Sequence, residues 1–191
     1  MKSVKFNEHT IVIKNSRFIC LLFQIENKQE IFTLLEETRM KYCDATHCCY
    51  AYILDCEKKA SDDGEPSGTA GIPILQVLEK NGLDHVLCIV VRYFGKIKLG
   101  AGGLVRAYTK SVTETLKNHI IILKKGFCAN VIFSYSALKT VDYLLKDVYI
   151  VNKEFGEKII YQIHATAEII EQLQTITDLE IETCYQLYLS D

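Results

Sequence analysis

The first two thirds of the chain alternate between two kinds of apolar stretch. Stretches rich in β-branched and aromatic residues predict strands, and residues 85–93 are apolar almost throughout, as in strands buried on both faces. Apolar residues three and four positions apart predict helices, most clearly at 28–42. The predicted strands lie at 10–13, 17–25, 46–54 and 85–93, and the predicted helices at 28–42, 69–80 and 103–118, with Thr69 as the N-cap of the second helix.

The remaining residues form a second, shorter series of elements. Strand patterns at 127–135, 149–154, 158–165 and 180–189 alternate with helix patterns at 137–146 and 167–174. The resulting order, β-α-β-β-α-β, is typical of the ferredoxin-like arrangement. We therefore predict an α+β protein with two domains, residues 1–126 and 127–191.

Two segments on either side of the apolar strand at 85–93 hold seven of the ten glycines. We call residues 61–71 the acidic loop and residues 92–103 the basic loop. Glycine loses more conformational freedom on folding than any other residue, so its concentration indicates unusual turns or close backbone approach. We expect the function to be concentrated in these two loops.

The acidic loop brings three carboxylates within four residues. Carboxylates clustered at a turn can ligate Mg²⁺ through oxygen or hold a positively charged partner. The alternative is ordinary turn formation, because Asp, Gly and Pro are common turn residues. The candidate residues for a metal or a partner are Asp62, Asp63, Glu65, Ser67 and Thr69.

The basic loop begins a strongly basic stretch. Residues 92–125 hold eight Lys and Arg against one acid, whereas residues 127–191 hold four against ten. Free amides at a helix start attract anions, and glycine lets a phosphate approach closely. The glycine spacing matches neither a P-loop nor a Rossmann turn, and a purely structural turn is the alternative. The candidate residues for nucleic-acid or anion binding are Arg92, Tyr93, Lys96, Lys98, Gly100, Gly102, Gly103, Arg106 and Lys110.

The eight cysteines raise the question of disulfides or a zinc site. Several lie in apolar strand-like runs and no secretory signal is evident, so we expect reduced thiols in a cytoplasmic protein without a membrane partner. Alternation along 46–54 sends His47 and Cys49 to one face of the sheet and Cys48 to the other, which disfavours zinc. We assign no catalytic residue and no cofactor apart from the Mg²⁺ considered for the acidic loop.

Both loops carry an extended motif. It comprises residues 45–47 (Ala-Thr-His), 61–71, 92–95 (Arg-Tyr-Phe-Gly), 99–100 and 102–108 (Gly-Gly-Leu-Val-Arg-Ala-Tyr). This motif resembles the signature of the IMPACT family, over about residues 14–117. The family usually has glycine where this chain has Lys96, and asparagine where it has Cys48.

The resemblance implies a first domain with the ribosomal-protein-like β/α fold of elongation factor G domain four, followed by a ferredoxin-like domain resembling that factor's last domain. It also implies a link to translation, because eukaryotic members are tied to translational control through the starvation-response kinase pathway.

The leading hypothesis is a non-catalytic, translation-associated regulatory or accessory protein that binds RNA or the ribosome through the basic loop and the helix after it. Tyr93 or Phe94 would stack on bases. Two alternatives stay open: a Mg²⁺-dependent enzyme acting on a phosphorylated small molecule, and a protein-protein interaction module in stress or translation control. A cleft shared by both loops would favour the small molecule, and separate loops would favour a macromolecule.

Overall fold

The structure is a computed structural model that describes residues 1–190. It is an α+β protein that divides into two compact units, Met1–Ile122 and Leu123–Asp191. The sequence places the domain boundary at residue 126, and the two units meet at 122, within strand β7 (Ile120–Phe133).

The first unit is built on one antiparallel sheet with the strand order β2-β3-β6-β4-β5. Its central strands are almost wholly buried because helices cover both faces. The edge strand β5 was not predicted, since its sequence, Glu-Lys-Lys-Ala-Ser, is polar and exposed or half-buried. The strands are β2 (Asn7–Ile13), β3 (Ser16–Gln24), β4 (His47–Leu54), β5 (Glu57–Ser61) and β6 (Val86–Tyr93).

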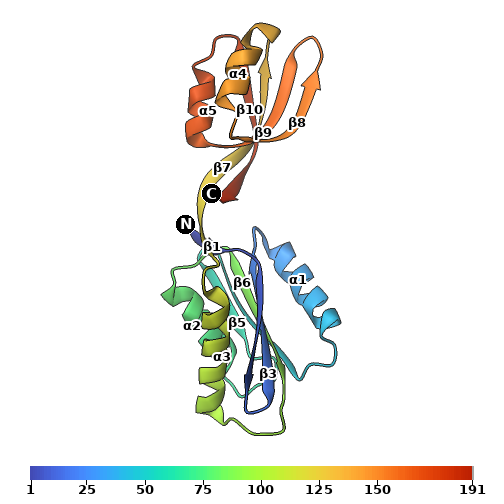
Figure 1. Cartoon of the computed structure of the whole chain (residues 1–191), viewed down its shortest axis with the longest axis vertical. Helices are drawn as coiled ribbons and strands as arrows, with labels where there is room; N and C mark the ends of the chain where they lie inside the picture. Colours follow the sequence, from blue (N-terminus) through green and yellow to red (C-terminus); the bar gives the residue numbers. More distant parts are fainter. Residues whose placement is uncertain (191) are drawn as a thin grey trace. The chain divides into compact units, whose positions relative to one another are not determined.

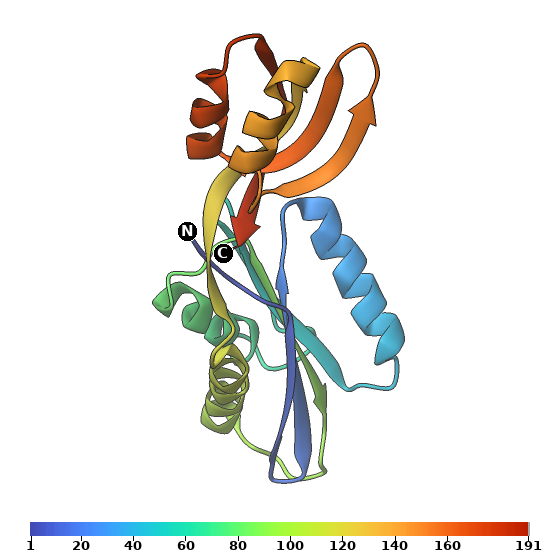
Figure 2. The same cartoon turned by 45° about the horizontal axis from the view of Figure 1, so that its top comes forward.

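Helices pack on both faces of this sheet (Figure 1). Helix α1 (Lys28–Lys41) covers one face, and α2 (Gly71–Lys80) and α3 (Ala101–Leu116) cover the other, as the turned view in Figure 2 also shows. The side chains of β4 alternate between the two cores: Cys49 packs with residues of α2 and α3, and Cys48 with residues of α1. The predicted divergence of the cysteines at 48 and 49 is therefore confirmed.

Helix α2 begins differently from the prediction. It starts at Gly71, and the residue at its cap position, Ala70, makes no side-chain cap hydrogen bond. The hydroxyl of Thr69 instead donates to the carbonyl oxygen of Pro66 at 2.6 Å. The prediction of Thr69 as N-cap is therefore wrong, because a carboxylate from the preceding loop, Asp62, binds the helix amides instead.

The second unit contains one antiparallel sheet with the order β10-β7-β9-β8. Its core joins helix residues such as Val141 and Leu173 to sheet residues such as Phe133 and Tyr161. Short strand β1 (Lys2–Val4) pairs with the first residues of β7, inside the first unit. The other elements are a 3₁₀ turn (Tyr135–Ala137), α4 (Leu138–Leu144), β8 (Tyr149–Phe155), β9 (Ile159–Thr166), α5 (Ala167–Gln174) and β10 (Leu179–Ser190).

Within residues 1–190, no helix has both the length and the apolar character that crossing a membrane requires.

Candidate functional site

Residues of the two glycine-rich loops line one pocket of about 430 Å³ in the first unit. The acidic loop contributes Glu65 and Pro66, and Thr46 and His47 come from directly before β4 and from its first position. The two loops therefore share a cleft. The sequence alone did not decide between a shared cleft and separate loops. The basic loop and α3 contribute Arg92, Phe94, Lys98, Leu99, Gly100, Ala101 and Leu104.

A buried ion pair contributes to the lining of this pocket. Nη1 of Arg92 donates to Oε1 of Glu65 at 2.6 Å, and the two side chains are only 6% and 2% exposed. The guanidinium lies 5.4 Å from the ring centroids of Phe18 and Phe94. Arg92 was expected to be part of an exposed basic surface, but it neutralises a buried carboxylate from the other loop.

Two further side chains extend the polar network away from the pocket. The Tyr108 hydroxyl donates to Oε1 of Glu65 at 2.8 Å, and Sγ of Cys49 donates to the carbonyl oxygen of Asp62 at 2.9 Å. Burial raises the pKa of both Cys49 and Tyr108. Both groups therefore stay protonated at neutral pH, as hydrogen-bond donors rather than nucleophiles.

The other two carboxylates of the acidic loop bind backbone amides. Asp62 accepts hydrogen bonds from Gly68, Ala70 and Gly71, at 2.7 to 2.9 Å. Burial alone would raise the pKa of Asp62, but these three donors outweigh it and lower the pKa. Oδ2 of Asp63 accepts from the amide of Cys48 at 2.7 Å, and Oδ1 lies 3.6 Å from Arg39.

The three carboxylates considered for Mg²⁺ thus each accept hydrogen bonds from a different set of donors within the protein. Within residues 1–190, no group of three or more His, Cys, Asp or Glu side chains is arranged to hold a metal ion. Of the other two candidate residues in this loop, Thr69 is buried and Ser67 is exposed.

The basic loop is held in place by close packing and by side chains from other strands. A Cβ on Gly95 would stand 2.0 Å from the backbone of Asn15, so a larger residue does not fit there. The amide of Gly95 donates to Oγ of Ser16 at 3.1 Å, and the amide of Phe94 donates to Oγ1 of Thr46 at 3.0 Å. Lys96 has φ +65, a conformation that favours glycine, which is the residue that the resemblance described above implies at this position.

The start of α3 offers free backbone donors at the edge of the pocket. Its cap residue, Gly100, has φ +71 and supplies no side-chain cap, and the first intrahelical bond runs from the amide of Leu104 to the Gly100 carbonyl. The amides of residues 101–103 precede that bond. Nη1 of Arg106 lies 3.8 Å from where a Cβ on Gly102 would stand, so this cation lies beside the helix start.

The structure divides the remaining basic-loop candidates into two groups. Tyr93 is half-buried, and its hydroxyl donates to Asp44 at 2.7 Å while the Arg17 guanidinium lies over its ring. Gly103 is half-buried against Leu99. The exposed candidates, all in the basic loop or on α3, are Lys96, Lys98, Gly100, Gly102, Arg106 and Lys110.

Several residues of the site were not among the candidates. Thr46 and His47 line the pocket, and Ser16 and Tyr108 hold its polar network. The sequence did contain a signal for Tyr108, because a tyrosine on the buried face of a helix needs a partner for its hydroxyl. The sequence contains no such signal for Ser16, because only the pairing of β3 with β6 brings its hydroxyl beside the basic loop.

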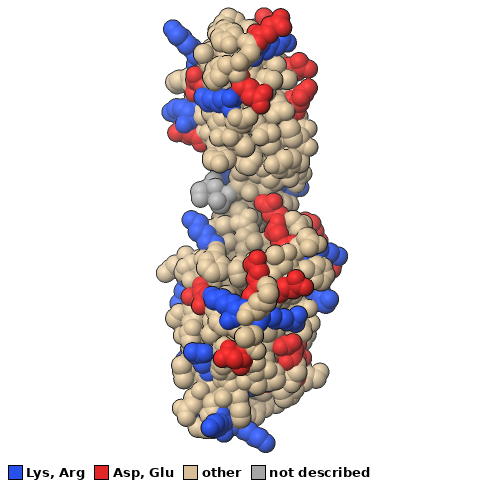
Figure 3. Space-filling model, turned by 90° about the vertical axis from the view of Figure 1, so that its right-hand side faces the viewer, with Lys and Arg blue, Asp and Glu red and all other residues tan. Residues whose placement is uncertain are grey.

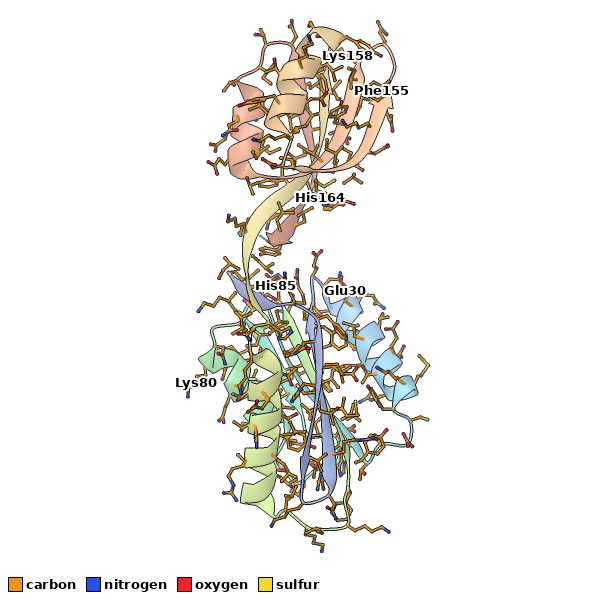
Figure 4. All side chains as sticks on the ribbon, in the orientation of Figure 1. Glu30, Lys80, His85, Phe155, Lys158 and His164 are labelled. Atoms are coloured by element: carbon orange, nitrogen blue, oxygen red, sulfur yellow. The ribbon has the colours of Figure 1, made fainter. Side chains whose placement is uncertain are left out.

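Histidines elsewhere in the chain lie apart from this pocket. His85 is 3% exposed and comes directly before β6, whereas the basic loop follows the other end of that strand (Figure 4). His164 lies in the second unit, tilted against Tyr149 with the ring centroids 5.5 Å apart. Neither residue lines the pocket.

The charged side chains on one broad face of the protein do not separate by sign. On the face that Figure 3 shows, Lys and Arg are interspersed with Asp and Glu.

In comparisons with known proteins, residues 14–116 match a family model described as the Impact N-terminal domain. IMPACT family member YvyE of Bacillus subtilis is 51% identical over 121 residues, which are 62% of this chain and 55% of YvyE. IMPACT family member YigZ of Escherichia coli is 40% identical over 110 residues, 55% of this chain and 54% of YigZ. The chain thus spans about half the length of the curated relatives it matches.

A solved structure covers nearly all of the chain. It is titled as the crystal structure of a hypothetical protein, and it has a TM-score of 0.61 and 27% identity over 96% of this chain and 97% of its own. The family model covers more than half of the chain and includes both loops and the pocket. The chain therefore belongs to the IMPACT family.

Proposed function

We propose that this chain is a translation-associated regulatory or accessory protein that binds RNA or the ribosome through the basic loop and the start of α3. One observation carries the proposal. The exposed cations Lys96, Lys98 and Arg106 lie in or beside a helix start that has no side-chain cap, and exposed Lys110 follows further along the same helix.

These four cations are available to a ligand. None of them forms an ion pair within residues 1–190, whereas the neighbouring Lys117 pairs with Glu114 at 2.6 Å. Lysine and arginine that neutralise phosphates release condensed counterions, which is the main source of affinity for nucleic acids. Exposed Phe94 adds an aromatic surface on which a base can stack.

Family membership supports the translational part of this proposal through the resemblance described above. We include in it the finer fold assignment: a ribosomal-protein-like first domain and a ferredoxin-like second domain, for which the order β10-β7-β9-β8 is the support. The acidic second domain would face away from RNA or bind a protein.

The test is a triple charge reversal, Lys96→Glu, Lys98→Glu and Arg106→Glu, in the full chain. We expect at least about a tenfold loss of affinity for single-stranded RNA, and a salt dependence whose slope falls by about 2, because each lost phosphate contact removes about 0.7. The matched control reverses three exposed lysines of the second unit, Lys139, Lys146 and Lys158. Equal RNA and ribosome co-sedimentation by the wild type and the basic-loop variant would refute the proposal.

A second candidate is an enzyme acting on a phosphorylated small molecule, and the pocket shared by both loops favours it. It would need Mg²⁺ to compete with the backbone amides that now bind Asp62 and Asp63. Calorimetry with Mg²⁺ and a panel of nucleotides and phosphorylated metabolites tests this candidate. If this candidate is correct, at least one member of the panel binds in the presence of Mg²⁺ and Asp63→Asn abolishes that binding. Absence of binding across the panel rules the candidate out.

A further inference from the structure

The pocket between the two loops is lined mostly by apolar atoms, and we call the surface of Pro66, Phe94 and Leu99 its apolar wall. Lys98 and the uncapped start of α3 supply polar groups to the same lining. We propose that this pocket binds a single nucleotide unit, with its phosphate at the start of α3 and its base against the apolar wall. The proposal rests on the proposed function and specifies which part of an RNA ligand the site recognises.

The proposed site has two independent supports. The amides of residues 101–103 lie at the positive end of the α3 dipole, with Lys98 and Arg106 beside them. Separately, Nε of Arg92 has no hydrogen-bond partner among residues 1–190, although the side chain is 6% exposed and lines the pocket. A buried donor without a partner is costly, so in native proteins a water or a ligand usually satisfies it.

The buried carboxylate of Glu65 does not oppose an anion. It already accepts from Arg92 at 2.6 Å and from Tyr108 at 2.8 Å. Because the charges of Glu65 and Arg92 cancel, Lys98 gives the pocket lining a net positive charge.

The base end combines a stacking surface with a histidine ring of fixed orientation. Phe94 is 43% exposed, and its ring lies over the Arg92 guanidinium, which restricts how the ring can turn. Nδ1 of His47 lies 2.8 Å from the carbonyl oxygen of Asp63, and a carbonyl only accepts, so Nδ1 carries the hydrogen. Nε2 of the same ring lies 3.8 Å from Oε2 of Glu65, so two acceptors fix the orientation of His47 in the pocket lining.

The size of the pocket agrees with this ligand. A volume of about 430 Å³ lies within the range of roughly 300 to 1,000 Å³ that small-molecule sites occupy. The same chemistry is offered by a free nucleotide and by one nucleotide of an RNA strand. The experiment therefore includes both.

The test measures binding to the full chain by calorimetry. The probes are AMP, adenosine, inorganic phosphate, and a short oligoribonucleotide with and without a 5′-phosphate. The main variant, Ala101→Trp, fills the pocket without removing a cation, and Thr113→Trp places the same side chain at an exposed position of α3 outside it. Phe94→Ala is a second variant that leaves the helix untouched, and thermal melting checks that each variant folds.

For the probe that binds, we expect Ala101→Trp to lower the affinity at least about tenfold and Thr113→Trp to leave the affinity unchanged. Phe94→Ala should weaken it by about tenfold through lost stacking. If AMP binds and Ala101→Trp abolishes that binding, the ligand is a free nucleotide. Binding of the oligoribonucleotide alone identifies an RNA nucleotide, and a preference for its 5′-phosphate identifies the terminal one.

Two results would overturn the proposal, and they are distinguishable. If RNA binds and the triple charge reversal weakens it, but neither Ala101→Trp nor Phe94→Ala has an effect, the pocket is not the site and the proposed function stands. If no nucleotide or RNA binds the wild-type chain, both fail.

Discussion

The two glycine-rich loops use their charged side chains in opposite ways. In the acidic loop, Asp62 and Asp63 bind backbone amides and Glu65 pairs with a buried arginine. In the basic loop and on α3, Lys96, Lys98 and Arg106 remain exposed. Both loops are rich in charge and glycine in the sequence, so the difference lies in which charges the fold itself already satisfies.

This difference shows what to ask of a charged cluster. A carboxylate with two or three amide donors stabilises a turn, and a ligand must compete with those donors. A cation that leaves its hydrogen bonds to water is free to bind a phosphate. The hydrogen bonds of each side chain are therefore a better guide to a binding role than the density of charge in the sequence.

Arg92 connects the two loops, and its removal should have the largest effect. Arg92→Met leaves the Glu65 carboxylate buried without its cation, so we expect the free energy of unfolding to fall by about 3–5 kcal/mol. Chemical denaturation measures it. The control is Lys58→Met, which breaks an exposed pair with Glu79 and should cost less than about 1 kcal/mol. Equal losses in the two variants would show that burial of the Arg92 pair contributes nothing.

Asp62 tests whether the acidic loop is structural. Asp62→Asn removes the charge that three amides bind, so we expect a loss of about 1–2 kcal/mol in denaturation at neutral pH. The pKa of Asp62 is lowered in the folded chain, so its stabilisation is complete above the unfolded pKa and is lost as pH falls through the folded value. The variant should therefore lose less stability on acidification than the wild type does. Identical acid unfolding curves would contradict this role.

Lys96 should give the smallest effect on stability. Lys96→Gly relieves the positive φ, and because glycine also makes the unfolded chain more flexible, we expect a net gain of no more than about 1 kcal/mol. Lys98→Gly removes the same charge at a position without positive φ and should lose about 0.5 kcal/mol. Both should weaken RNA binding a few-fold. A loss of stability in both variants would mean that φ at residue 96 costs nothing.

Much of the fold could be predicted because local patterns determine it. The bounds of α5 match the predicted 167–174, and the alternation along β4 distributes its cysteines as expected. Strand β5 and the cap of α2 could not be predicted, since a short polar strand has no periodic signal and the capping carboxylate lies outside the helix. The burial of Arg92 depended on Glu65, and nothing in the local sequence indicates which residue lies opposite.

The polar network beneath the pocket also has a consequence for folding kinetics. Its hydrogen bonds join Arg92 to Glu65, Tyr108 to Glu65 and Arg92 to Ser16, which are 27, 43 and 76 positions apart in the chain. Contacts of such high sequence separation form only after long loops have closed. The pocket lining should therefore be completed among the last events of refolding in the first unit, so that a probe of the Arg92–Glu65 contact would report complete folding rather than collapse.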